Sequence, residues 1–137
     1  MSNMRIFDIA GSALSAQNQR LNLVASNLAN VDAVSSSADK TYRSRQPVFQ
    51  TLLDQANPRA SAQGVRMAGV VESQAPLQKE YAPNHPMADA DGFVYKPNVN
   101  PVEEMANMIS ATRAYQSNVE VVNSARQMIS ATLNLGK

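Results

Sequence analysis

The chain has 137 residues, 12 of them basic and 11 acidic, which gives a net charge of +1 at neutral pH. That balance gives no electrostatic reason to expect nucleic acid or an anionic membrane as a partner. The sequence has no cysteine, which excludes a disulfide framework, a thiolate nucleophile and a cysteine-ligated zinc ion. No apolar run is long enough to span a bilayer, and polar residues interrupt the N-terminal segment. We therefore expect neither a membrane helix nor a cleaved signal peptide.

The first predicted element is a helix over about residues 4–31. Its apolar residues recur at intervals of three and four, the spacing of one helical face, and part of the pattern is a heptad repeat. This seam is predicted to pair with a second helix, and its members are Phe7, Leu14, Leu21, Val24, Leu28 and Val31. An outer line on the opposite side is predicted to contact other subunits, and it consists of Ile9, Ala16, Leu23, Asn27 and Asn30.

The middle region, residues 33–99, holds most of the prolines and is predicted to form a small, mostly antiparallel β region with long loops. Serine and aspartate make "VDAVSSSADKTY" a loop, and "YRSRQPVFQTLL" fits either a strand or a short helix. Three further segments are predicted strands because of alternation or of β-branched and aromatic residues: "GVRMAGVVES", "PLQKEYAP" and "GFVYKP".

The last predicted element is a helix that begins after Asn100, a good N-cap, with Pro101 at the first helical position and Glu103 at the capping-box spacing. Its predicted seam runs through Met105, Met108, Thr112, Tyr115, Val119, Val122, Arg126, Ile129 and Leu133. Its outer line, predicted to be a subunit interface, comprises Ala114, Val121, Met128 and Leu135. Small neutral residues flank this line, so a second helix could approach it without the desolvation cost of a charge.

These patterns predict an α+β fold in which the long N- and C-terminal helices pair as an antiparallel coiled coil, with the small β region between them in the sequence. Residues 1–32 and 100–137 are predicted to form one discontinuous domain, and residues 33–99 the β-rich part. Each helix then carries a second apolar line that lacks a partner in so short a chain. Two alternatives follow: the outer lines contact other subunits, or the middle region covers them.

No arrangement of residues predicts a catalytic, cofactor-binding or metal site. The segment "DADG", Asp89–Gly92, is similar to part of a calcium loop, but the first and twelfth positions of an EF-hand would hold Met87 and Asn98. A turn that leads into a strand is predicted instead. His85 is the only histidine and is predicted to be a loop residue. We therefore expect no enzymatic activity, no cofactor, no metal and no small-molecule substrate.

The segments "FDIAGSALSAQNQRLNLVASNLANVD" and "NVNPVEEMANMISATRAYQSNVEVVNSARQMISATLNLGK" resemble the N- and C-terminal segments of flagellar axial proteins, the family of rod, hook and hook-associated subunits. The length and the motifs "YRSRQPVFQ" and "HPMADADGFVYKPNVN" are most similar to the rod members of that family. The resemblance covers nearly the whole chain.

The resemblance implies a structural subunit of the proximal rod, the shaft that crosses the periplasm inside the flagellar basal body. It implies export through the flagellar type III apparatus without signal cleavage, and terminal helices that form an inner tube. The implied partners are other rod proteins and copies of the chain itself, the membrane ring at the rod base, and the export apparatus. The alternatives are another axial component, such as a rod paralogue or a hook-type subunit, and a helical export adaptor or chaperone.

Overall fold

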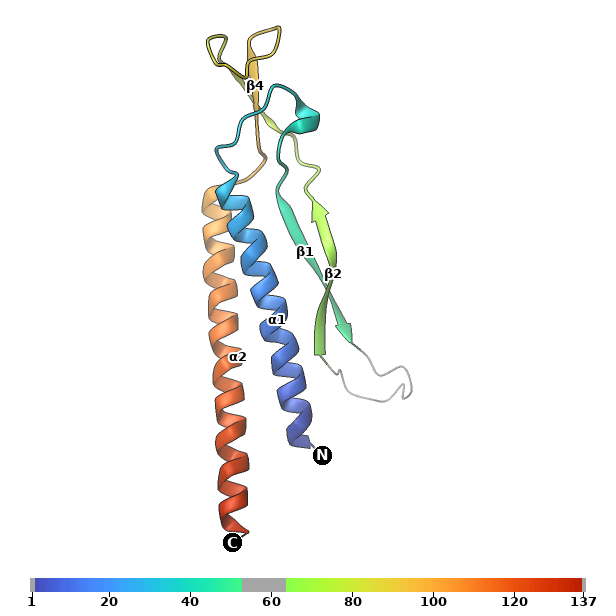
Figure 1. Cartoon of the computed structure of the whole chain (residues 1–137), viewed down its shortest axis with the longest axis vertical. Helices are drawn as coiled ribbons and strands as arrows, with labels where there is room; N and C mark the ends of the chain where they lie inside the picture. Colours follow the sequence, from blue (N-terminus) through green and yellow to red (C-terminus); the bar gives the residue numbers. More distant parts are fainter. Residues whose placement is uncertain (1, 53–63, 137) are drawn as a thin grey trace. The chain divides into compact units, whose positions relative to one another are not determined.

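The computed structural model describes residues 2–52 and 64–136 of the chain (Figure 1). The elements follow one another as α1 (Ser2–Ala29), a 3-10 turn η1 (Ala38–Lys40), β1 (Arg45–Leu52), β2 (Gly64–Glu72), β3 (Gln78–Tyr81), β4 (Phe93–Lys96) and α2 (Pro101–Leu135). Two packed helices with small antiparallel sheets confirm the predicted α+β class. No helix among the described residues is long and apolar enough to cross a membrane.

The chain divides into two compact units. The first unit comprises Met1–Leu21, Pro47–Gly69 and Ile109–Lys137, and the second comprises Asn22–Gln46 and Val70–Met108. Each unit takes part of both helices and part of the middle region. The borders of the units therefore do not coincide with the borders of the three predicted segments.

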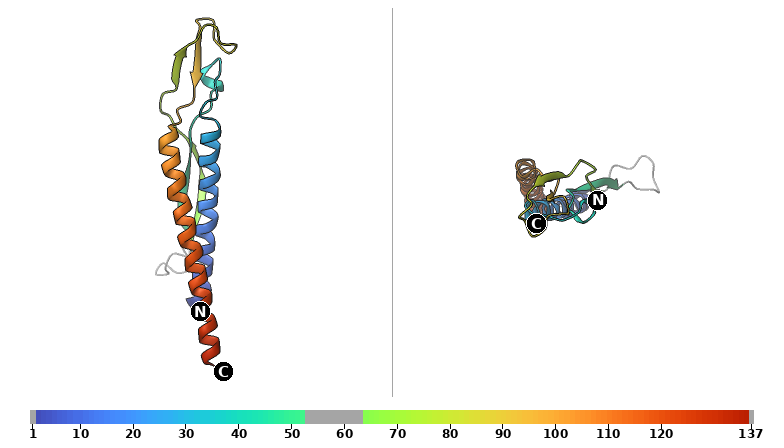
Figure 2. Two further views of the ribbon diagram at one scale, coloured as in Figure 1. Left: turned by 90° about the vertical axis from the view of Figure 1, so that its left-hand side faces the viewer. Right: turned by 90° about the horizontal axis from the view of Figure 1, so that it is seen from above.

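The first unit has a core of small side chains. Within it, the early part of α1 lies beside the later part of α2, and the two helices run in opposite directions (Figures 1 and 2). The fully buried apolar side chains described in this unit are all alanines: Ala10, Ala16, Ala111 and Ala125. Alanine lets helices and strands approach closely, and it also has the highest intrinsic helix propensity. One residue type therefore favours both close packing and helix formation.

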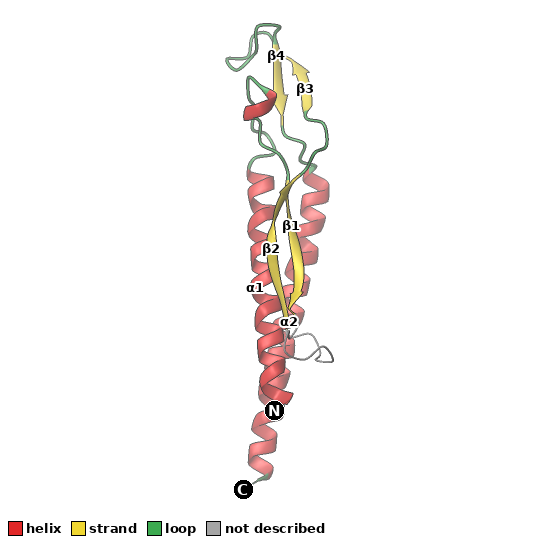
Figure 3. Cartoon of the chain, turned by 90° about the vertical axis from the view of Figure 1, so that its right-hand side faces the viewer, coloured by secondary structure: helices red, strands yellow, loops and turns green. Residues whose placement is uncertain are grey.

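A two-stranded ribbon of β1 and β2 completes the first unit, and its strands run in opposite directions (Figure 3). β2 begins against α1, where the N–H of Val65 donates to Ser12 Oγ at 3.1 Å. Gly64 has a φ of 149°, and a Cβ built there would lie 2.5 Å from Ser12 Oγ. Only glycine fits this approach, because it tolerates the positive φ and leaves room for the hydroxyl. The ambiguous segment "YRSRQPVFQTLL" is a strand as far as Leu52, and its last residue, Leu53, lies outside the described residues.

The second unit contains the antiparallel pair β3–β4, in register from Gln78 opposite Lys96 to Tyr81 opposite Phe93. Val94 is 2% exposed and anchors the buried face of this pair. On the "DADG" turn, Asp89 Oδ1 accepts the N–H groups of Asp91 and Phe93 at 3.0 and 2.8 Å. This confirms the predicted turn that leads into a strand.

α2 begins as predicted. Asn100 Oδ1 accepts the N–H of Val102 at 3.1 Å, so the side chain caps the helix, and Pro101 occupies its first position. The Glu103 side chain is exposed, and no bond from it to the N–H of Asn100 is among the described hydrogen bonds, so the second half of the predicted capping box does not form. The N–H of Glu104 donates to the Asn100 carbonyl at 3.0 Å, which is the first hydrogen bond of the helix.

Candidate assembly surface and the asparagine clasp

The predicted seam of α1 lies on the covered side of the helix. Val24 is buried at 4% exposure, and the other members are half-buried. They are Phe7, Leu14, Leu21 and Leu28 on α1, and Val31, which lies in the turn after the helix because α1 ends at Ala29.

The predicted seam of α2 is only partly on the covered side. Met108, Val122 and Ile129 are half-buried, as a packing role requires. The remaining apolar members are exposed, at 53%, 38%, 36% and 66% for Met105, Tyr115, Val119 and Leu133. The positions that are buried instead lie one residue earlier in the sequence, at Glu104, Ala111 and Ala125.

The physical reason for this difference is side-chain size. The pattern of large apolar residues predicts that the stripe through Met105 and Val119 is buried. In the structure the adjacent stripe, which contains alanines, is buried instead, because small side chains allow neighbouring elements to approach closely. Close packing then excludes the larger side chains from the contact. The structure thus turns several large apolar side chains of α2 toward solvent.

The predicted outer line of α1 differs from expectation, because most of it is covered within the chain. Ile9 is 41% exposed, and Leu23 and Asn30 are half-buried. Ala16 and Asn27 are only 3% and 1% exposed, so neither offers a surface to another subunit in this conformation. Ile9, Ala16, Leu23 and Asn27 share a face of α1 with the Ser12 hydroxyl that receives β2, whereas Asn30 lies in the turn after the helix. The middle region therefore contacts part of the outer line, at Ser12 and at Asn27.

The outer line of α2 is open along most of its length. Val121, Met128 and Leu135 are 46%, 56% and 88% exposed, and only Ala114 is half-buried. They stand seven residues apart, so they lie on one face of the helix. Exposed apolar side chains in a regular row are typical of an interaction surface rather than of a solvated one.

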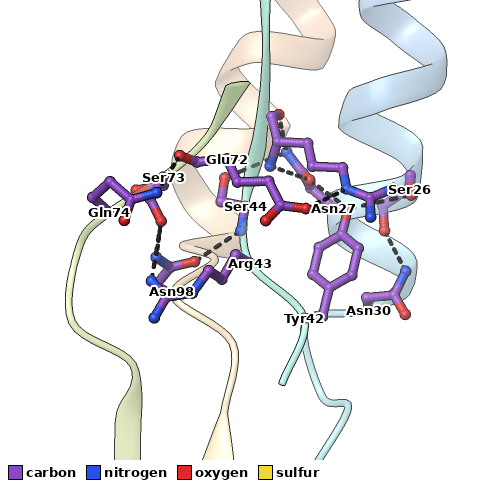
Figure 4. A network of polar contacts seen from close by, with 11 residues as sticks. Ser26, Asn27, Asn30, Tyr42, Arg43, Ser44, Glu72, Ser73, Gln74 and Asn98 are labelled. Carbon is purple, nitrogen blue, oxygen red and sulfur yellow. Dashed lines mark hydrogen bonds and ion pairs between the residues drawn. The ribbon is translucent and has the colours of Figure 1, made fainter. Parts of the chain in front are cut away.

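Asn27 holds the start of β1 against the end of α1 (Figure 4). Its Nδ2 donates to the carbonyl of Arg45 at 2.9 Å and to Ser44 Oγ at 3.5 Å. Its Oδ1 accepts the N–H of Arg45 at 3.0 Å and the hydroxyl of Tyr42 at 2.8 Å. The side-chain amide thus bonds both backbone groups of one residue, as a neighbouring strand would.

Asn98, just before α2, bonds backbone groups on the other side of that segment, but those of three different residues (Figure 4). Its Oδ1 accepts the N–H of Ser44 at 2.8 Å, and its Nδ2 donates to the carbonyls of Ser73 and Ala75 at 3.2 and 2.9 Å. The N–H of Ser73 donates directly to the carbonyl of Ser44 at 2.8 Å. We call Asn27, Asn98 and the backbone that they bond the asparagine clasp.

Basic side chains next to the asparagine clasp are already engaged. Arg43 donates to the carbonyl of Ser73 at 3.2 Å, and Arg45 lies 3.4 Å from a carboxylate oxygen of Glu72 and over the ring of Tyr42. They border a polar cavity of about 630 Å³. Because Arg45 is paired with a carboxylate and Arg43 donates to a backbone carbonyl, the geometry favours a structural role for this cluster over a binding site for an anion.

Sequence reasoning did not find the asparagine clasp. Asn98 and Ser44 are 54 positions apart, and nothing in the local pattern links them. Asn27 lies in the last turn of α1, and its residue type does not separate it from Asn18 and Asn22 in the same helix, so the local sequence carries no signal for its role. For metals, no group of three or more ligand side chains comes together among the residues that the structure describes.

Known families match both ends of the chain. The family "Flagella basal body rod protein" matches residues 7–35, and the family "Flagellar basal body rod FlgEFG protein C-terminal" matches residues 90–135. These two segments include nearly all of both helices that carry the surfaces described above. The class of protein is therefore a structural component of the flagellar basal-body rod.

Relatives over the full length make the family specific. The flagellar basal-body rod protein FlgC of Escherichia coli O6:H1 is 53% identical, and that of Salmonella typhimurium is 50% identical, each over 137 residues and all of both chains. FlgC of Bacillus subtilis is 30% identical over 150 residues, again with both chains fully covered. The chain belongs to the FlgC family of flagellar basal-body rod proteins, and is a structural subunit of the rod in the basal body.

Proposed function

We propose that the chain assembles into the rod through the open outer line of α2, with Val121, Met128 and Leu135 as contacts to a neighbouring rod subunit. The observation that supports this proposal is the distribution of side chains in the first unit, where small apolar side chains are buried and several large ones are exposed. Alanines fill the buried positions, while large apolar side chains of α2 are 46–88% exposed along that line. An isolated chain gains nothing from this arrangement, whereas a subunit in a densely packed shaft does.

The family and the resemblance described above support the setting that we propose for this contact. The terminal helices form the inner tube of a shaft that spans the periplasm. The chain reaches that place through the flagellar type III export apparatus, without cleavage of a signal peptide. Its neighbours are copies of itself, other rod proteins and the membrane ring at the rod base. The role is structural and requires no catalytic group or cofactor.

The test is a charge placed in the outer line. Val121→Asp should leave the isolated chain folded, because the side chain is 46% exposed and surface substitutions usually change stability by less than about 0.5 kcal/mol. In an assembled contact the same carboxylate is buried without a partner and costs several kcal/mol. We expect normal expression and thermal unfolding, but loss of the variant from purified basal bodies and loss of motility.

The matched control is Gln127→Asp, which introduces the same charge on an exposed position of the same helix but outside the outer line. It should enter basal bodies at the wild-type level. Incorporation of Val121→Asp at the level of Gln127→Asp would show that the outer line of α2 is not a subunit contact.

A further inference from the structure

The outer line of α2 contains a chemically reactive member, Met128. Its side chain is 56% exposed, so reagents in solution reach its sulfur before assembly. A peroxide oxidises a thioether by a two-electron step. The sulfur lone pair attacks one peroxide oxygen, an S–O bond forms, the O–O bond breaks, and the peroxide leaves as water or an alcohol. The product, methionine sulfoxide, is polar and chiral.

Exposure separates the described methionines into two groups. Met128, Met105 and Met87 are 56%, 53% and 43% exposed, whereas Met67 and Met108 are half-buried. Only Met128 lies in the outer line. Met87 lies in the turn region between β3 and β4 and is a natural internal control, because it is accessible to a similar degree but belongs to another part of the chain.

The surroundings of Met128 do not accommodate a sulfoxide in a buried contact. Its neighbours in the outer line are Val121 and Leu135, which offer no hydrogen-bond donor. The hydroxyl of Thr132, one turn away, already donates to the carbonyl of Met128 at 2.8 Å. Within α2 the donor in reach of a buried sulfoxide oxygen is the hydroxyl of Ser124, one turn earlier and exposed. A polar group that is buried against apolar side chains with less than its full set of hydrogen bonds weakens a contact by about fivefold or more.

We propose that Met128 is a modification site at which oxidation by a peroxide prevents an unassembled subunit from entering the rod. This inference rests on the proposed function, because it requires the outer line of α2 to be a contact. It adds that the contact depends on the redox state of one side chain. Reduction of the sulfoxide by a methionine sulfoxide reductase restores the apolar thioether and the ability to assemble.

The first arm of the test measures reactivity. The purified full-length chain is treated with hydrogen peroxide, and peptide mapping follows each methionine separately. Met128 and Met105 should gain oxygen ahead of Met108 and Met67. Oxidation of Met128 at the rate of the half-buried methionines would overturn the inference, because the site would not be accessible.

The second arm measures assembly in cells whose own copy is deleted. Met128→Gln imitates the polarity of the sulfoxide, and Met128→Leu keeps an apolar side chain that peroxide does not oxidise. Met87→Gln is the matched control. We expect Met128→Gln to enter basal bodies at least about fivefold less than Met128→Leu, while Met87→Gln and Met128→Leu match the wild type. Equal thermal unfolding of the purified variants excludes a folding defect.

The outcomes distinguish this inference from the function on which it rests. If Met128→Gln assembles as well as Met128→Leu while Val121→Asp does not assemble, the outer line is a contact but Met128 does not control it, and the inference is overturned. If Val121→Asp also assembles, the proposed contact itself is wrong and the inference falls with it.

Discussion

At the scale of single residues, the asparagine clasp uses a side-chain amide as a substitute for a peptide group. A primary amide presents one carbonyl and one N–H in nearly the geometry of the backbone, so it can pair with both polar groups of a strand residue. Asn27 does this with Arg45 and adds the Tyr42 hydroxyl as a further donor. A buried polar side chain of 1% exposure is stable here because its hydrogen bonds are satisfied.

Asn27→Ala should destabilise the isolated chain by about 2–3 kcal/mol, because it removes both hydrogen bonds to the backbone of Arg45 and leaves the Tyr42 hydroxyl with only its longer contact to Ser26 Oγ at 3.3 Å. Asn22→Ala, at an exposed position of the same helix, should change stability by less than about 0.5 kcal/mol. Urea-induced unfolding followed by circular dichroism measures both values. Equal values for the two variants would mean that the asparagine clasp contributes little to stability.

At the scale of elements, the sequence predicts which elements form but not how far each helix is rotated. The two helices, the N-cap at Asn100 and the strands β2, β3 and β4 could be predicted, because their signals are local, whereas the segment that forms β1 fitted either a strand or a short helix. The buried face of α2 could not, because heptad spacing fits the stripe through Met105 and the stripe through Ala111 equally well. Only the three-dimensional packing shows that the stripe of small residues is the buried one.

The difference in burial between the two helices also separates Leu23 and Val121, two positions for which the sequence predicts the same role. Leu23→Asp should destabilise the isolated chain by about 2 kcal/mol or more, since Leu23 is half-buried on the covered face of α1. Val121→Asp, on the open line of α2, should leave the melting temperature nearly unchanged. Differential scanning calorimetry of the two purified variants makes the comparison. A larger loss for Val121→Asp than for Leu23→Asp would contradict the burial described here.

The β3–β4 pair should respond to pH through the ion pair of Glu80 with Lys96. The hydrogen bond from Lys96 and its charge lower the pKa of Glu80 below 4.5. Because the pKa of Glu80 is lower in the folded state than in the unfolded state, the ion pair stabilises the fold above pH 4.5. This stabilisation is lost as the pH falls through the folded pKa. In turn, the hydrogen bond to Glu80 and the charge of Glu80 raise the pKa of Lys96 above 10.5. The contribution of Lys96 to stability is therefore present below pH 10.5 and lost as the pH rises through its folded pKa.

Hydrogen exchange of the β3 and β4 amides should therefore show the best protection between these limits and a small loss on acidification below about pH 4. Both side chains are exposed, so the effect is modest. Glu80→Gln should abolish the acid-dependent part of the change and leave the rest of the profile intact. An identical acid response in wild type and Glu80→Gln would assign it to another group.

At the scale of the whole molecule, the exposed helix surface is short of charge. Between Ser110 and Leu135 only Arg113, Glu120 and Arg126 are charged. A surface of this kind associates through removal of apolar area from water rather than through ion pairs. It suits the proposed contact with a neighbouring rod subunit, because two such surfaces do not repel one another.

Association of the purified subunit should consequently be insensitive to ionic strength. Raising sodium chloride from about 0.1 M to about 0.5 M should change the association constant by less than about twofold, although it shortens the screening length about twofold. Ammonium sulfate should strengthen association, because it favours burial of apolar surface. Sedimentation equilibrium provides the measurement, and a tenfold weakening by sodium chloride would indicate an interface that depends on ion pairs.

The buried alanines have a consequence for how mutations in this chain are scored. At Ala111, which is 0% exposed, every larger side chain crowds its neighbours, whereas Leu135, which is 88% exposed, can be shortened without loss to the isolated chain. A screen for soluble expression would therefore rank the smallest side chains as indispensable and the largest as neutral. A screen for swimming would find both groups intolerant. Positions at which the two screens disagree would trace the contacts of the subunit without any view of the assembled rod.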